Sequence, residues 1–247
     1  MDGVRFRSNK TSSDNRAAVV YENLLLAAVP DSERRRLLAQ CESIDLAFGD
    51  VLCEQGDPIR HLYFPTGSFI SLISSIDDRP RLEVGLIGAE GMLGVSLALG
   101  VAIAPLRAVV QGTGSALRIK TATFCRELSR SPGLAKVLRR YLYVLMSQLA
   151  QMAACTRFHL VEARLCRWLL MTRDRAHSDQ LYLTQEFLAY MLGVRRGGIV
   201  RAASDLQKRK LIRYVRGTMI IVDGSGLEAR SCSCYATARD MHVRLMR

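Results

Sequence analysis

The spacing of apolar residues changes twice along the chain. Between residues 44 and 119, apolar and polar residues alternate in short runs separated by turns rich in Gly and Pro, whereas the flanking regions have helical spacing. The strand-like runs lie at 44–48, 51–53, 61–64, 68–76, 81–87, 106–110 and 116–119. Many short strands at near-regular spacing are typical of a small antiparallel barrel or jelly roll. We therefore expect an α+β chain whose residues 17–130 form this domain, with a short helix packed on it between residues 90 and 100.

A long helix is predicted over residues 131–158, with Pro132 in its first turn. Residues at alternating spacings of four and three form one stripe along it: Leu134, Leu138, Tyr141, Leu145, Gln148, Met152 and Cys155. Such a heptad seam is the pattern by which a helix pairs with a second copy of itself. A helix packed only on its own barrel needs a similar stripe, but this helix is longer than a small barrel can cover. We expect it to form the interface of a homodimer.

Two short amphipathic helices separated by Gly193 are predicted within the stretch from Thr184 to Tyr214. Glycine can adopt the left-handed conformation that ends one helix and turns the chain sharply into the next. Ala189 is small enough for the second helix to cross closely, and Ile199 can fill the angle between the helices. This combination is typical of a helix-turn-helix.

The second of these helices starts near Arg195 and carries arginines on its leading face, where they can pair with guanine or with phosphate. An amphipathic helical hairpin with a solvated basic face is the alternative. The two β runs that follow, around Arg216-Gly217, favour the DNA-binding interpretation because a hairpin after a helix-turn-helix makes a winged helix. The residues expected to contact DNA are Thr184, Arg195, Arg196, Gly197, Arg201, Lys208, Arg213 and Arg216.

The charge distribution supports a polyanionic partner. The chain has a net charge of +12, and residues 159–247 contribute 16 basic and 8 acidic residues to it. A basic helix on a membrane surface is disfavoured, because the charges are spread over two short helices and a hairpin. No run approaches the ~18 apolar residues of a membrane span, and residues 1–16 contain no apolar core of a signal peptide. We therefore expect a cytoplasmic protein without a membrane partner.

The remaining segments and the cysteines complete the domain prediction. Residues 1–16 are expected to be a disordered tail, residues 159–223 a winged-helix domain, and residues 224–247, which show no strong pattern, a basic tail. Seven cysteines are expected to be free thiols. Cys232-Ser-Cys234 is the one close pair, but no matching pair or histidine cluster lies nearby in the sequence, so no metal is expected.

An enzyme is not expected. A metal cupin requires several His and carboxylate ligands inside the barrel, and His61 is the only histidine in that segment. The other histidines lie in the helical and tail regions, and no constellation for nucleophilic catalysis accompanies them.

A barrel, a long helix and a winged helix in this order resemble the CRP/FNR family of regulators. The motifs that carry the resemblance are Gly49-Asp50-Val51-Leu52, Glu54-Gln55-Gly56-Asp57, and the stretch from Leu183-Thr184 to Ile212. The resemblance implies a homodimeric transcription regulator that binds a pseudo-palindromic site in double-stranded DNA and senses a signal through its barrel. RNA polymerase would be a further partner of an activator. A cyclic-nucleotide-type module acting on a protein partner is the alternative, but such a module has no need of a winged helix.

The chain departs from the cyclic-AMP-binding members of this family. Their ribose-binding Gly-Glu pair falls on Gly94-Val95, and their phosphate-binding Arg-Ser pair falls on Leu106-Arg107. Leucine cannot neutralise a buried phosphate, and a strand residue one position away points to the opposite face. Any effector pocket is expected to include Gly94, Val95, Ser96, Leu106 and Arg107, with cyclic AMP disfavoured. The sequence leaves open whether the domain binds another small molecule or no effector.

Two further departures concern cofactors and base recognition. An iron–sulfur cluster of the oxygen-sensing members is not expected because no cysteine precedes Cys41, and a haem ligand at His61 is disfavoured, so no cofactor is predicted. The family's Arg-Glu-x-x-x-Arg set becomes Arg196 to Arg201 with Gly197 in the acidic position. We expect an altered half-site specificity.

Overall fold

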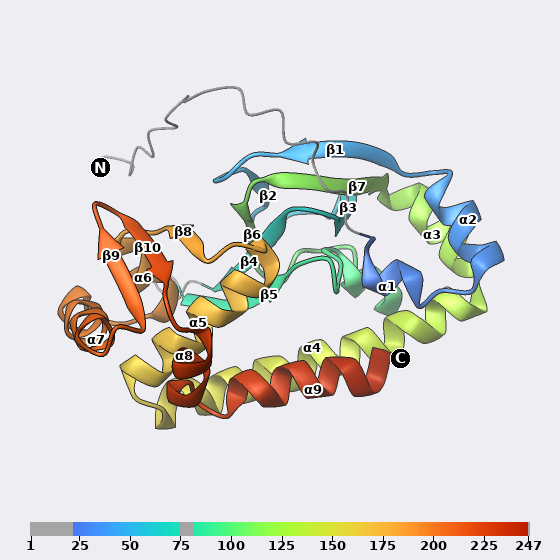
Figure 1. Ribbon diagram of the computed structural model, residues 1–247. Helices are drawn as coiled ribbons and strands as arrows, with labels where there is room; N and C mark the ends of the chain where they lie inside the picture. Colours follow the sequence, from blue (N-terminus) through green and yellow to red (C-terminus); the bar gives the residue numbers. More distant parts are fainter. Residues whose placement is uncertain (1–21, 75–81, 247) are drawn as a thin grey trace.

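The computed structural model describes residues 22–74 and 82–246 (Figure 1). The expected disordered tail at residues 1–16 lies outside this part. Seven strands follow the predicted pattern closely: β1 (Glu42–Leu46), β2 (Val51–Cys53), β3 (His61–Pro65), β4 (Phe69–Ser74), β5 (Leu82–Ile87), β6 (Arg107–Gly112) and β7 (Gly114–Lys120).

These strands form two antiparallel sheets, one in the order β1-β7-β3 and one in the order β2-β6-β4-β5. Apolar side chains from both sheets, including Ile70, Ile87, Val110 and Ala116, fill the space between them. The antiparallel jelly-roll-like architecture is therefore confirmed. Within the described ranges, no ladder joins the two sheets, so the barrel that the pattern also allowed does not close.

Short helices cover one end of the sheets: α1 (Leu24–Ala27), α2 (Asp31–Leu38), the 3₁₀ helix η1 (Val95–Leu99) and α3 (Thr121–Ser129). The element η1 lies in the segment where a short helix was predicted. The buried Asn23 begins α1 by accepting a hydrogen bond from the Leu26 amide, and its own amide donates to the carbonyl oxygens of Pro65 and Gly91. This side chain ties the first helix to the domain core.

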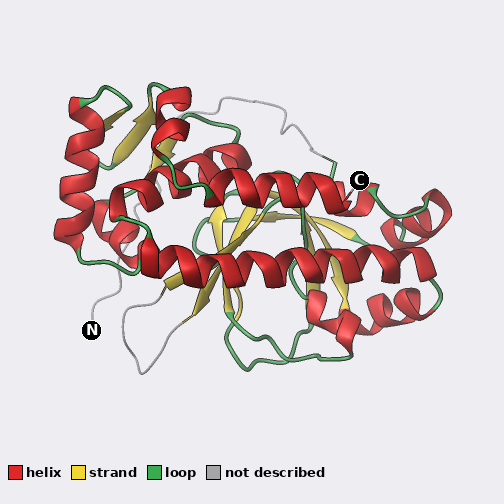
Figure 2. Cartoon of the chain, turned by 90° about the horizontal axis from the view of Figure 1, so that it is seen from below, coloured by secondary structure: helices red, strands yellow, loops and turns green. Residues whose placement is uncertain are grey.

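The long helix α4 extends from Pro132 to Phe158, with Pro132 in the first turn as predicted. Figures 1 and 2 show it running beneath the sheets along the length of the molecule. Leu134, Leu138 and Tyr141 are fully buried in the core of their own domain. The assignment of these three residues to a dimer interface is therefore wrong, because the jelly roll already covers them.

The C-terminal region contains α5 (Val161–Ala176), β8 (Gln180–Tyr182), α6 (Gln185–Leu192), α7 (Arg196–Lys208), β9 (Ile212–Val215) and β10 (Thr218–Ile221). The three strands pair in the order β8-β10-β9, so the predicted hairpin has a third strand that the sequence pattern did not indicate. A single core of apolar residues, including Trp168, Leu188, Ile199 and Leu206, holds these elements together.

The expectation of a basic tail at residues 224–247 is wrong. Two helices, α8 (Gly224–Arg230) and α9 (Cys234–Met246), follow the hairpin, and α9 packs alongside α4 (Figures 1 and 2). Asp223 caps α8 by accepting a hydrogen bond from the Gly226 amide, and the hydroxyl group of the buried Tyr235 donates to Asp174 on α5. The cap is a polar signal without hydrophobic periodicity, and the Tyr235 contact joins residues 61 positions apart, so the apolar pattern indicated neither helix.

The jelly roll and the C-terminal region pack against each other. Ile73 of β4 belongs to the C-terminal core, and the Trp168 indole donates a hydrogen bond of 2.8 Å to the Glu83 carboxylate on β5. Arg175 on α5 pairs with Glu90 of the jelly roll. No helix in residues 22–74 and 82–246 combines the length and the apolar character that a membrane span requires.

Candidate functional site

The two helices α6 and α7 meet at the turn that the sequence predicted. Thr184 caps α6 by accepting a hydrogen bond of 3.0 Å from the Phe187 amide. Gly193 ends α6 in the left-handed conformation, with φ +60°, and the Val194 amide donates to the Ala189 carbonyl oxygen at 2.9 Å. Ile199 is completely buried between the helices. The local geometry is that of a helix-turn-helix.

A basic surface covers the outer side of this unit. Arg195 precedes α7 as its N-cap residue, Arg196 and Arg201 are exposed on α7, and Lys208 ends the helix beside Asp205. Figure 1 shows α7 at one end of the molecule, away from the jelly roll. Every residue predicted to contact DNA is exposed: Thr184, Arg195, Arg196, Gly197, Arg201, Lys208, Arg213 and Arg216.

The hairpin beside α7 has a tight turn with an arginine at its tip. Val215 pairs with Thr218, so Arg216 and Gly217 form a two-residue connection. Both have positive φ angles, 49° for Arg216 and 81° for Gly217, as a type I′ turn requires. Arginine rarely adopts this conformation, so the chain places a cation at the tip at some conformational cost.

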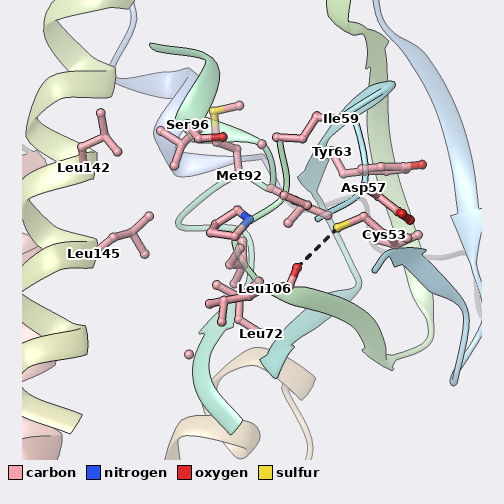
Figure 3. A pocket seen from close by; sticks show the side chains of 18 of the residues that line it. Cys53, Asp57, Ile59, Tyr63, Leu72, Met92, Ser96, Leu106, Leu142 and Leu145 are labelled. Atoms are coloured by element: carbon pink, nitrogen blue, oxygen red, sulfur yellow. Dashed lines mark hydrogen bonds between the residues drawn. The ribbon is translucent and has the colours of Figure 1, made fainter. Parts of the chain in front are cut away.

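A cavity of about 490 Å³ lies between the jelly roll, η1 and α4 (Figure 3). Four of the five predicted effector-pocket residues line it, namely Gly94, Val95, Ser96 and Leu106. Arg107 does not belong to the lining, and its guanidinium group pairs with Glu54 at 3.5 Å. The prediction that Arg107 points away from the pocket agrees with this arrangement, and its inclusion among the pocket residues is corrected.

The lining of the cavity is mainly apolar and weakly charged. Figure 3 shows Met92 and Leu106 from the jelly roll on one side and Leu142 and Leu145 from α4 on the other. Burial, reinforced by the charge of Arg118, lowers the pKa of His61 and disfavours its charged form. Burial also raises the pKa of the Cys53 thiol, which keeps it protonated. Arg60 adds one exposed cation to the lining.

Ser96 offers a buried polar group to a ligand in the cavity. The hydroxyl oxygen of Ser96 on η1 is buried and has no hydrogen-bond partner among the described residues. A buried hydroxyl group without a partner is unfavourable, so a ligand that supplies one is stabilised there.

The exposed apolar stripe on α4 lies one residue away from the predicted seam. Leu142, Met146, Leu149 and Ala153 repeat at spacings of four, three and four, and Met146 and Leu149 are 68% and 41% exposed. Leu145, Gln148 and Met152 of the predicted seam are half-buried instead. A shift of one residue preserves the heptad spacing, so the pattern alone could not decide which face the jelly roll would cover.

Comparisons with known proteins agree with this geometry. Residues 163–230 match the family model of the Crp-like helix-turn-helix domain. No curated protein matches the chain by sequence. Among solved structures, the c-di-GMP-responsive global regulator CLP of Xanthomonas campestris is similar, with 19% identity over 78% of this chain and 99% of that chain and a TM-score of 0.64.

Two further solved structures share the fold. A protein of Eubacterium rectale described as a Crp/Fnr-family transcriptional regulator is 15% identical over 85% of this chain and 99% of its own, with a TM-score of 0.67. FixK2 from Bradyrhizobium japonicum is 13% identical over 78% of this chain and 98% of its own, with a TM-score of 0.61.

The chain therefore has the fold of CRP/FNR-type transcription regulators, a cyclic-nucleotide-binding-like domain followed by a C-terminal DNA-binding region. That region is a Crp-like helix-turn-helix domain, and the matched residues extend beyond the hairpin into α8.

Proposed function

We propose that the chain is a homodimeric, sequence-specific transcription regulator that reads a pseudo-palindromic DNA site. The observation that carries the proposal is the exposed face of α7, where Arg196 and Arg201 point away from a helix-turn-helix whose turn and cap are fully formed. Two such helices, one from each protomer, would enter successive major grooves ~34 Å apart. Arg216 at the hairpin tip would rest on the sugar-phosphate backbone.

The stripe of Leu142, Met146, Leu149 and Ala153 supports dimerisation through α4. Exposed apolar residues at heptad spacing on a 27-residue helix are stabilised when a second copy of the helix covers them. Leu142, Met146 and Leu149 also line the cavity, so a partner helix on this stripe would cover part of the cavity's opening. Dimerisation and ligand binding would then share residues.

The cavity supports a small, largely apolar effector with one group that hydrogen-bonds to Ser96. By the resemblance to the cyclic-AMP-binding members, their phosphate-binding arginine falls on Leu106, which lines the cavity, whereas Arg107 lies outside the lining and pairs with Glu54. Calorimetric titration with cyclic AMP is expected to show no binding at micromolar concentrations. Saturable binding of cyclic AMP would overturn this part of the proposal.

The proposed DNA contacts are tested by site selection from random duplexes followed by affinity measurements. Arg196→Ala and Arg201→Ala are each expected to cost ~1–3 kcal/mol of specific binding and to relax the preference at one base position. Arg216→Asn removes the charge, and asparagine tolerates the positive φ at this position. The variant is expected to bind all DNA sequences more weakly to the same extent, and the slope of log affinity against log salt concentration is expected to fall by about one.

Two outcomes would contradict the DNA-binding proposal. If the chain selects no duplex over random competitor, sequence-specific recognition is excluded. If it selects a site but Arg196→Ala and Arg201→Ala bind it with unchanged affinity, α7 is not the recognition helix.

A further inference from the structure

Four side chains with metal-binding atoms meet where α4 ends and α9 begins. Cys155 lies in the last turn of α4, and His159 is its C-cap residue. Cys232 lies between α8 and α9, and Cys234 is the first residue of α9. One ligand atom from each of the four lies within 4.8 Å of the other three. The fold thus brings Cys155 and His159, which are far away in the sequence, next to the Cys232-Cys234 pair.

The distances match one tetrahedral ion. A Zn²⁺ ion with bonds of ~2.3 Å to sulfur and ~2.0–2.1 Å to nitrogen would hold neighbouring sulfur atoms roughly 3.8 Å apart and a sulfur and a nitrogen roughly 3.6 Å apart. The Sγ atoms of Cys155 and Cys232 are 3.7 Å apart, and Sγ of Cys234 is 3.6 Å from Nδ1 of His159. A disulfide requires a separation of ~2.05 Å and does not describe this cluster.

The protein encloses the three thiols. Cys155, Cys232 and Cys234 are buried, and Ala163 packs against them. A thiolate, and not a thiol, is the form that binds metal ions.

Two buried arginines supply counter-charge to the cluster. Arg164 and Arg167 on α5 are only 5% and 4% exposed, and both interact electrostatically with Cys155. In the described part of the chain, the Nε atoms of both arginines lack hydrogen-bond partners. Three thiolates and an imidazole around Zn²⁺ leave one negative charge in excess, and cations buried beside it offset that charge.

We propose that Cys155, His159, Cys232 and Cys234 bind one Zn²⁺ ion in a closed structural site. Four protein ligands complete the tetrahedral shell, so no position remains open for water or substrate. Thiolate-rich sites with imidazole suit Zn²⁺ among the common divalent ions. A span of 4.8 Å between ligand atoms suits a single ion and leaves no room for a multi-iron cluster.

The position of the site determines what it would stabilise. Cys155 and His159 lie at the end of α4, just before the short link to α5, whereas Cys232 and Cys234 lie beyond the helix-turn-helix. One ion would therefore join both sides of the link and fix the start of α9, which packs along α4. Metal binding would hold the C-terminal domain in one orientation relative to the long helix. The site itself does not depend on the proposed regulatory function.

Metal analysis of the full chain tests the proposal. The chain is purified with a reductant and without chelators. Inductively coupled plasma mass spectrometry is then expected to find about one zinc ion per protomer. After metal removal under reducing conditions, titration with Co²⁺ is expected to give the charge-transfer and d–d absorption of a tetrahedral thiolate complex at one equivalent. A chain that contains no zinc and binds neither Zn²⁺ nor Co²⁺ would overturn the proposal, as would a native Cys155–Cys232 disulfide.

Matched variants localise the ion. Cys234→Ser is expected to lower zinc affinity by at least about a hundredfold, because a ligand is lost. The control, Cys125→Ser, changes an exposed thiol on α3 and is expected to leave affinity unchanged. If both variants lost zinc equally, the ion would lie elsewhere.

A conservative variant separates a metal ligand from a residue that only supports the fold. His159→Cys keeps four ligands, so it is expected to retain about one Co²⁺ per chain and to show stronger thiolate charge-transfer absorption. This readout does not require Cys234→Ser to fold. An unchanged Co²⁺ spectrum in His159→Cys would remove His159 from the site.

Discussion

At the scale of single residues, the glycines of the helix-turn-helix have opposite roles. Gly193 has a φ of +60°, and a Cβ atom added there would lie 2.9 Å from Leu82 of β5. Gly198 lies inside α7, and the nearest atom to an added Cβ is Val161 at 3.9 Å, an ordinary contact. The turn therefore requires its glycine, whereas the helix does not.

This difference predicts stability changes of opposite sign. Gly198→Ala is expected to increase the free energy of unfolding by about 1 kcal/mol, because alanine has the higher helix propensity and restricts the unfolded chain. Gly193→Ala is expected to decrease it by at least ~1 kcal/mol through backbone strain and the contact with Leu82. Urea denaturation of the full chain, followed by circular dichroism, measures both. Equal effects of the two variants would contradict this account of the turn.

Gly197 is the residue at which base specificity is expected to depart from the related regulators. An added Cβ would meet only the Arg201 guanidinium group, at 3.9 Å, so a larger side chain fits. Gly197→Glu is expected to gain a preference for cytosine at one position of each half-site, because a carboxylate accepts a hydrogen bond from the cytosine amino group. Site selection compares this variant with Gly197→Ala. If both select the wild-type site, residue 197 does not read a base.

At the scale of elements, α4 carries two apolar faces. The face of Leu134, Leu138 and Tyr141 belongs to the jelly-roll core, and the face of Leu142, Met146, Leu149 and Ala153 is open to solvent or half-covered. Tyr141 also donates a hydrogen bond to the Met92 carbonyl oxygen and accepts one from the Met92 amide, which fixes the helix against the segment before η1. The second face is therefore the one available to a partner.

The open face predicts the effect of a charge at its centre. Met146→Glu is expected to weaken dimerisation roughly a hundredfold, because a symmetric interface would bury two unpaired carboxylates. Arg140→Glu places a carboxylate on another exposed side of α4 and is expected to leave the dimer intact. Sedimentation velocity over a range of concentrations distinguishes the two. Dissociation by Arg140→Glu alone would place the interface elsewhere.

The helices and strands were largely predictable from the sequence, whereas the tertiary contacts between them were not. The strand runs, the Pro132 start of α4 and the Gly193 turn follow from local spacing and backbone preference. The choice between the two faces of α4 depends on which one meets Met92, and the convergence of Cys155 with Cys232 spans 77 residues. Such tertiary contacts leave no periodic trace in the sequence.

At the scale of the whole molecule, β5 connects the cavity to the DNA-binding domain. Val84 and Gly85 line the cavity, and the adjacent Glu83 is buried on the side facing α5. The Glu83 carboxylate accepts hydrogen bonds from the Ser71 hydroxyl at 2.7 Å and from the Trp168 indole at 2.8 Å. A ligand that moves β5 would therefore act on the contact with Trp168, which gives the proposed regulation a physical route.

The ionisation of Glu83 makes this contact sensitive to pH. Burial raises the pKa of the carboxyl group from 4.5 to about 7, although the hydrogen bonds from Ser71 and Trp168 and the charges of Arg167 and Arg175 oppose the increase. The folded chain therefore holds a proton that the unfolded chain releases at lower pH. The stabilisation is fully present below pH 4.5 and is lost as the pH rises to about 7, a change of roughly 3 kcal/mol.

Glu83→Gln tests the coupling, because glutamine keeps the shape and can still accept the indole hydrogen bond but does not titrate. Trp168 is the only tryptophan of the chain, so its fluorescence reports on the contact directly. In the wild-type chain the emission is expected to change with a midpoint near pH 7, together with the decline in unfolding free energy. In Glu83→Gln both changes are expected to disappear. A fluorescence midpoint that persists in the variant would show that another group titrates beside Trp168, and β5 would no longer be the connection between the cavity and the DNA-binding domain.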